Sequence, residues 1–118
     1  MKFIMNGIEY IIREVEQEEM WKESHKEMNL EEGWYFGKTL FYKDEIWLDK
    51  SLSKAKKRKT LMHELMHCYI KCFFAHNEMN FDEEALCDIS ANAHDIINDI
   101  VEKYFKEKVN DKNKDSKK

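Results

Sequence analysis

Residues 60–74, TLMHELMHCYIKCFF, place two histidines four positions apart, with a glutamate directly after the first. His63, Glu64 and His67 form an H-E-x-x-H pattern. Positions i and i+4 lie on one face of a helix, so both imidazoles can reach a single metal ion. Glu64 is about 100° around the helix from His63, where it is poorly placed as a ligand but close to a water on that metal. The pattern therefore requires a helix here and predicts a metal site on it.

The helix that carries this pattern should begin at Ser51 or Ser53, either of which is a suitable N-cap, and end near Phe74. We expect this helix to be largely buried except for one polar strip. The strip carries the two histidines and Glu64, and it should face a cavity or a site. The alternative is a helix with two surface histidines. The apolar side chains that surround the strip are Leu61, Met62, Leu65, Met66, Cys68, Tyr69, Ile70, Cys72 and Phe73.

A catalytic zinc needs a third protein ligand, with water in the fourth position. His76 is a weak candidate in the loop after the helix. The next segment, FDEEALCDISA, offers Glu84 and Asp88 on one face of the last helix. We expect Glu84 to be the third ligand, with Glu83 as its main competitor. Asp88 would accept a hydrogen bond from a ligand imidazole. The alternative for each of these acids is an exposed position on the surface with no role in the site.

The remaining pattern predicts four short strands and three helices in one α+β domain over residues 1–108. Asn6-Gly7 suits the type I′ turn of a β-hairpin. We expect a short antiparallel or mixed sheet packed on the histidine-bearing helix and on the C-terminal helix. Residues 109–118 end in NDKNKDSKK and are expected to form a disordered charged tail. The other expected elements are a helix over 16–30, strands within 34–42 and 45–49, and a last helix over 82–108.

The composition and charge of the chain argue against several classes of function. The 118 residues carry a net charge of −4, so direct nucleic-acid binding is not expected from the chain as a whole. No apolar run is long enough for a membrane span, and the N-terminus lacks the pattern of a signal peptide. The three cysteines do not suggest a disulfide framework, which indicates a cytoplasmic protein. We expect Cys68, Cys72 and Cys87 to pack in the core.

A basic run, KAKKRK, occupies residues 54–59, at the start of the histidine-bearing helix. Its simplest interpretation is a solvated helix face. The alternative is a docking patch for an acidic partner or for nucleic acid.

A family resemblance covers about half of the chain, from Gly37 to Ile97. The stretches that carry it are IWLDKSLSKAKKRKTLMHELMHCYI and FDEEALCDISANAHDII. They resemble small phage- and mobile-element-encoded members of the ImmA/IrrE metallopeptidase family. The resemblance implies a zincin-like domain that binds Zn²⁺ through His63, His67 and Glu84, with Glu64 as the general base. Larger members carry an E-A-N-x-F-A-like segment after the last ligand, where this chain has E-A-L-C-D-I.

These observations predict a zinc-dependent metallopeptidase that hydrolyses a peptide bond in a protein substrate. The resemblance implies a regulatory substrate such as a helix-turn-helix repressor. We expect the substrate to add as a strand beside residues 45–49. The candidates for stabilising the oxyanion, none favoured by spacing, are Tyr42, Tyr69, His76 and His94.

Two alternatives belong to other classes. The first is a catalytically weak or inactive zincin-fold phage protein that acts as a binding or inhibitory module on a host protein. The second is a purely structural zinc site, which would need a fourth ligand such as Cys87 or Asp88.

Overall fold

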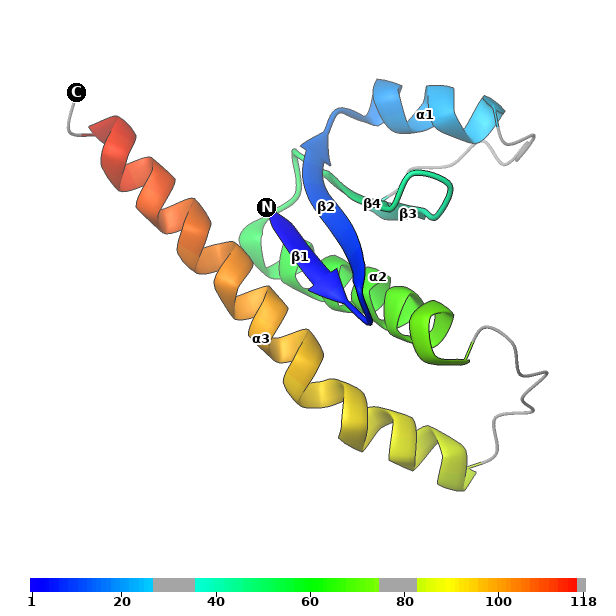
Figure 1. Ribbon diagram of the computed structural model, residues 1–118. Coiled ribbons are helices and arrows are strands. Elements are labelled where there is room, and N and C mark those ends of the chain that lie inside the picture. The colour runs from blue at the N-terminus through cyan, green and yellow to red at the C-terminus, as the bar shows by residue number, and fades with distance from the viewer. Residues whose placement is uncertain (27–35, 75–82, 117–118) are drawn as a thin grey trace.

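The computed structural model describes residues 1–26, 36–74 and 83–116. Within these ranges the chain forms a small α+β domain of four strands and three helices (Figure 1), as the sequence predicts. The elements are β1 (Lys2–Met5), β2 (Ile8–Val15), α1 (Gln17–Lys26), β3 (Gly37–Leu40), β4 (Glu45–Asp49), α2 (Lys54–Phe74) and α3 (Glu83–Ser116).

The β1–β2 hairpin forms as its turn sequence predicts. Met5 pairs with Ile8, so the connection has two residues. Asn6 and Gly7 have φ angles of 50° and 79°, the positive values that a type I′ turn requires. Asparagine and glycine tolerate this left-handed region better than other residues do, which is why the pair determines the turn.

The sheet is mixed, with strand order β1-β2-β4-β3. β2 pairs with β4 in parallel, and the other two pairings are antiparallel. β4 is therefore an interior strand with partners on both sides, and β3 is an edge strand. The expectation that a substrate strand adds beside residues 45–49 is wrong, because the backbone groups of β4 already pair with β2 and β3.

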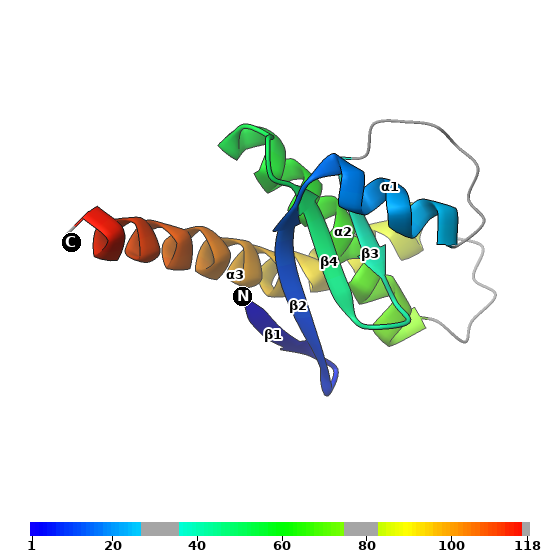
Figure 2. The ribbon, with the colours of Figure 1, turned by 90° about the horizontal axis from the view of Figure 1, so that it is seen from above.

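Helices cover both faces of this sheet, with α1 on one side and α2 and α3 on the other (Figures 1 and 2). Side chains of β4 alternate between the two faces, since Trp47 packs on the α1 side whereas Ile46 and Leu48 face α2. The α1 side is a small cluster of Val15, Met20, Leu40 and Trp47. The larger core contains Phe3, Met5, Tyr10, Ile12, Leu61, Leu65, Cys68, Tyr69, Ile89, Ala93, Ile97, Ile100, Val101 and Tyr104.

The turn from β4 into α2 is organised by a buried carboxylate and a serine cap. Asp49 is 1% exposed, and its Oδ1 accepts hydrogen bonds of 2.9 Å from the backbone N–H and the hydroxyl of Ser51. Its Oδ2 accepts a hydrogen bond of 2.8 Å from Gln17 at the start of α1. Ser53 Oγ accepts a hydrogen bond of 3.3 Å from the Lys56 N–H, so Ser53 is the N-cap of α2.

The last helix is longer than the sequence pattern predicts. α3 continues to Ser116 instead of ending near Lys108, so the helix extends into the expected charged tail. Residues 109–116 contain neither proline nor glycine, and nothing in their sequence interrupts the helical backbone. No helix within the described ranges is long and apolar enough to cross a membrane.

Candidate metal site

α2 brings His63, Glu64 and His67 together, and this group could hold a metal ion. The candidate ligand atoms of the three residues lie within 4.8 Å of one another. The two Nε2 atoms of the histidines are 3.2 Å apart, with the ring planes at 79°. Two nitrogens bound to one tetrahedral zinc at about 2.0–2.1 Å would be about 3.3–3.4 Å apart. The imidazoles therefore already have the spacing of two ligands of one ion.

Glu64 is buried, whereas the histidines beside it are exposed. Glu64 is 7% exposed, and the His63 side chain is 68% exposed. The Thr39 hydroxyl on β3 donates a hydrogen bond of 3.0 Å to Glu64 Oε1. The other carboxylate oxygen, Oε2, lies 3.9 Å from His63 Nε2. Glu64 is thus held from the sheet by one oxygen and presents the other toward the histidines.

This geometry corrects the expected polar strip on a largely buried helix. The sheet and α3 cover α2 on part of its circumference only, since Met62 and Phe73 are 37% and 42% exposed. The strip crosses the boundary between core and solvent, with Glu64 inside and both histidines outside. A helix wheel places polar residues relative to one another but not relative to the packed face of a sheet.

A close approach of β3 to α2 positions Thr39 over Glu64. A Cβ on Gly37 would lie 2.5 Å from Thr60 Cγ2, 3.1 Å from the Trp47 carbonyl oxygen and 3.4 Å from Glu64 Cγ. Only glycine fits at this position without a shift of its neighbours. Sequence reasoning missed both Gly37 and Thr39 as residues of the site. A glycine inside a strand is the signal that could have found them, because it often marks a close backbone contact.

The acids predicted to complete the site lie on α3. Glu84 and Asp88 are exposed in its first turns, and the structure does not bring either into the group on α2. Among the described residues, no hydrogen bond joins Asp88 to His63 or His67. His76 and the Glu83 side chain lie outside the described residues. Glu84 as third ligand, and Asp88 as hydrogen-bond acceptor for a ligand imidazole, therefore stay predictions.

The three cysteines divide between core and surface. Cys68 is fully buried, and burial raises its thiol pKa to about 12. Cys72 packs against the core, with its sulfur 3.3 Å from the Tyr10 hydroxyl. Cys87 is exposed, so its expected place in the core is wrong. Cys87 precedes the buried Ile89 by two positions, which is about 200° around the helix, so the two side chains lie on opposite sides of α3.

Three of the candidates for stabilising the oxyanion lie in different surroundings. The Tyr42 hydroxyl donates a hydrogen bond to Glu23 on α1. Tyr69 is 6% exposed and packs in the core against Phe73. His94 is exposed on α3. In the described part of the chain, none of the three belongs to the metal-site group, and neither does Cys87 as a possible fourth ligand.

We compared the chain with protein-family models, with curated proteins and with solved structures, and none of the three comparisons gave a match. The structure defines a small α+β domain with a mixed four-stranded sheet. Within the described residues, this domain carries one histidine–glutamate group that could hold a metal ion.

Proposed function

We propose that this protein is a zinc-dependent metallopeptidase with a zincin-like domain, related to the ImmA/IrrE family. The observation that carries the proposal is the 3.2 Å separation of His63 Nε2 and His67 Nε2, with the Glu64 carboxylate beside them. Two imidazoles with the spacing of ligands and an adjacent buried carboxylate are the elements of metal-assisted hydrolysis.

His63 and His67 would hold Zn²⁺ through Nε2, with Glu84 as the third ligand and Asp88 as an acceptor for an imidazole N–H. When bound, Zn²⁺ would supply Lewis-acid chemistry and lower the pKa of water. Glu64 would accept the proton of the attacking water and transfer it to the leaving amine. Because the Thr39 hydroxyl donates to Oε1, Oε2 would be the oxygen that accepts this proton.

The edge strand β3 supports a protein substrate bound in extended form. The Asp49 N–H donates to the Phe36 carbonyl, which sets the pairing pattern of β3 with β4. In this pattern the N–H and C=O groups of Gly37 and Thr39 point away from β4. A substrate strand that bound these groups would lie next to Glu64. The family resemblance favours a regulatory protein, such as a helix-turn-helix repressor, as this substrate.

Metal content tests the site directly. We expect about one zinc per chain in the purified wild type by mass spectrometry of the metal, and loss of it in His63→Ala and in His67→Ala. His94→Ala is the matched control, because this exposed histidine lies on α3 outside the group and its loss should leave zinc unchanged. Full zinc retention in both α2 variants would overturn the site.

Catalysis is tested with Glu64→Gln, which should keep zinc but hydrolyse no protein. Proteins captured by this variant from lysate would be incubated with wild type, and new N-termini would be identified by mass spectrometry. We expect cleavage by wild type and none by Glu64→Gln. Zinc binding without any new N-terminus would support the proposed metal site but contradict the proposed peptidase activity.

A second candidate is a binding module that uses the same domain to inhibit a host protein. The position of Glu84 outside the group and the exposure of both histidines favour it. If the cellular effect of Glu64→Gln equals that of wild type, the binding module is the better explanation.

A further inference from the structure

The edge strand β3 runs along α2, and a lysine of α2 meets an aromatic ring at each end of the strand. Directly before β3, Lys56 Nζ lies 5.9 Å from the centre of the Phe36 ring. Directly after it, Lys71 Nζ lies 5.6 Å from the centre of the Phe41 ring. Between these two contacts, Thr39 joins the strand to the middle of the helix. The two lysines therefore mark the two ends of one sheet edge.

Both lysines keep their charge available for an outside partner. They are exposed, and among the described residues no carboxylate lies within ion-pair distance of Lys56 or Lys71. Each ammonium instead rests near an aromatic ring, at a distance typical of a cation–π contact. Such a contact orders the side chain without neutralising it. The β3 edge thus has an unmatched positive charge at each end.

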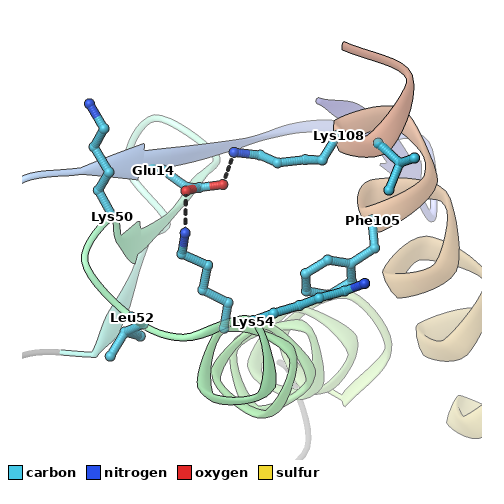
Figure 3. Close-up of a pocket in the computed structure, with 8 residues that line it drawn as sticks. Glu14, Lys50, Leu52, Lys54, Phe105 and Lys108 are labelled. Carbon is cyan, nitrogen blue, oxygen red and sulfur yellow. Dashed lines mark ion pairs between the residues drawn. The ribbon is translucent and has the colours of Figure 1, made fainter. Parts of the chain in front are cut away.

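Two neighbours of Lys56 in the basic run 54–59 behave differently, because acids already match them. Lys57 Nζ lies 2.8 Å from Glu14 Oε1, beside a pocket in which that carboxylate pairs with two lysines (Figure 3). Arg58 Nη2 lies 2.6 Å from Glu102 Oε1 on α3. These two contacts join α2 to β2 and α3. The charge at the β3 edge is therefore a property of Lys56 and not of the whole run.

α2 itself supplies no exposed acid that could compete for the two lysines. Glu64 is the single acid in the sequence of this helix, and it is buried under β3. An extended segment beside β3 would therefore meet positive charge near both of its ends. Complementary charge at the rim of a binding surface favours the correct partner and its register.

The separation of the two lysines sets the spacing of their partners. At 1.5 Å per residue, Lys56 and Lys71 are about 22 Å apart along the axis of α2. An extended strand covers this length in about six to seven residues. Side chains alternate between the two faces of a strand, so two side chains that both point toward α2 are separated by an even number. A separation of about six residues meets both conditions.

We propose that the β3 edge binds an extended segment of a partner protein with two acidic side chains about six residues apart. One acid would pair with Lys56 and the other with Lys71. The outward backbone groups of Gly37 and Thr39 would pair with the stretch between them. This inference rests on the strand addition in the proposed function and names the charge pattern of that substrate. It does not require that the bound segment be cut.

Fluorescence anisotropy on the full chain at low salt tests the proposal with labelled ten-residue peptides. The probe has a threonine- and valine-rich sequence with two glutamates six positions apart. We expect it to bind about tenfold more tightly than the same peptide with glutamines, since each exposed ion pair contributes modestly. An isomer with both glutamates at one end should also bind more weakly. N-methylation of alternate residues should abolish binding, because it removes the N–H donors of one strand edge.

Variants at the two ends of β3 test the lysines themselves. Lys56→Gln and Lys71→Gln should each weaken binding of the probe about threefold, and the double variant about tenfold. The double variant should also lose most of the salt dependence. Lys2→Gln is the matched control, because this exposed lysine lies on β1, the other edge strand of the sheet. It should bind the probe like wild type.

Three results would overturn the proposal. The first is equal binding of the glutamate and glutamine peptides. The second is an equal loss in Lys2→Gln and Lys56→Gln, which would indicate general attraction of negative charge. The third is tighter, lysine-dependent binding of a single-stranded oligonucleotide, which would assign this face to nucleic acid.

Metal analysis and a chelator separate this inference from the proposed function. Glutamate-dependent binding by a protein that contains no zinc would contradict the metallopeptidase and support the acidic partner. Zinc-dependent cleavage of a substrate, with no preference for glutamate in the peptides, would support the metallopeptidase and overturn this inference.

Discussion

The Thr39 hydroxyl donates a hydrogen bond of 3.0 Å to the Glu64 carboxylate and so joins the edge strand β3 to the buried side of α2. Glu64 is one of three buried polar or charged residues in the described part of the chain. A buried carboxylate is destabilising unless hydrogen bonds satisfy it. The bond therefore supports the fold and orients the group proposed as the general base.

Replacing Thr39 by valine should destabilise the protein by about 1–3 kcal/mol, because valine keeps the shape but leaves Glu64 without this donor. Thr39→Ser retains the hydroxyl and should recover most of the loss. Urea unfolding followed by circular dichroism measures both variants. Equal stability of Thr39→Val and wild type would show that the hydrogen bond contributes nothing to the folded state.

Gly37→Ala should destabilise the protein by about 1–3 kcal/mol through overpacking, because the new Cβ would lie 2.5 Å from Thr60 Cγ2. The loss should shrink in a Thr60→Ser background, which removes that methyl group. Gly7→Ala is a useful comparison. Its φ of +79° is unfavourable for alanine, but a Cβ there would meet nothing within 4 Å. Its effect should not depend on residue 60, and a double-mutant cycle by urea unfolding distinguishes the two cases.

Tyr104→Phe should lower the free energy of unfolding by about 1–3 kcal/mol, because the buried hydroxyl donates to the Glu14 carboxylate between β2 and α3. Lys103→Ala, at the position before Tyr104, is the control. Its pair with Asp99 is 2.9 Å long but more than 60% exposed on both sides, and its loss should have little effect. Comparable losses in the two variants, measured by thermal or urea unfolding, would contradict a stabilising role for the Glu14 contact.

The cysteines should differ in reactivity and in their effect on pH dependence. At pH 8 in the native protein, Cys87 should react quickly with a thiol reagent, whereas Cys68 should react only on unfolding, since it is fully buried. Fast modification of Cys68, located by peptide mass mapping, would contradict its place in the core.

Burial raises the Cys68 thiol pKa from its ordinary value of 9.0 to about 12, so the unfolded chain loses this proton first as pH rises. The stabilisation is fully present below about pH 9 and falls by about 1.4 kcal/mol per pH unit toward pH 12. Cys68→Ala should show a shallower decline of unfolding free energy over this range. Cys87→Ala, on the surface, should decline like wild type, and parallel curves for wild type and Cys68→Ala would contradict the raised pKa.

Local sequence signals predicted the parts of the fold that depend on neighbouring residues. Asn6-Gly7 formed the expected turn, Ser53 was one of the two expected caps, and His63 and His67 met at helical spacing. Each of these rests on backbone preferences or on the period of a helix, which act over about four residues. The α+β class followed from the order of such segments along the chain.

The amino-acid order thus settled the turn, the cap and the paired histidines, because each is held within one short segment. Tertiary structure alone decided that β4 lies between β2 and β3, since the pairing of Ile12 with Ile46 joins distant segments. The same packing buried Glu64 under β3 and left His63 exposed. Which face of each element meets the core depends on pairing and packing between segments far apart in the chain. The spacing of residues within one segment does not determine it.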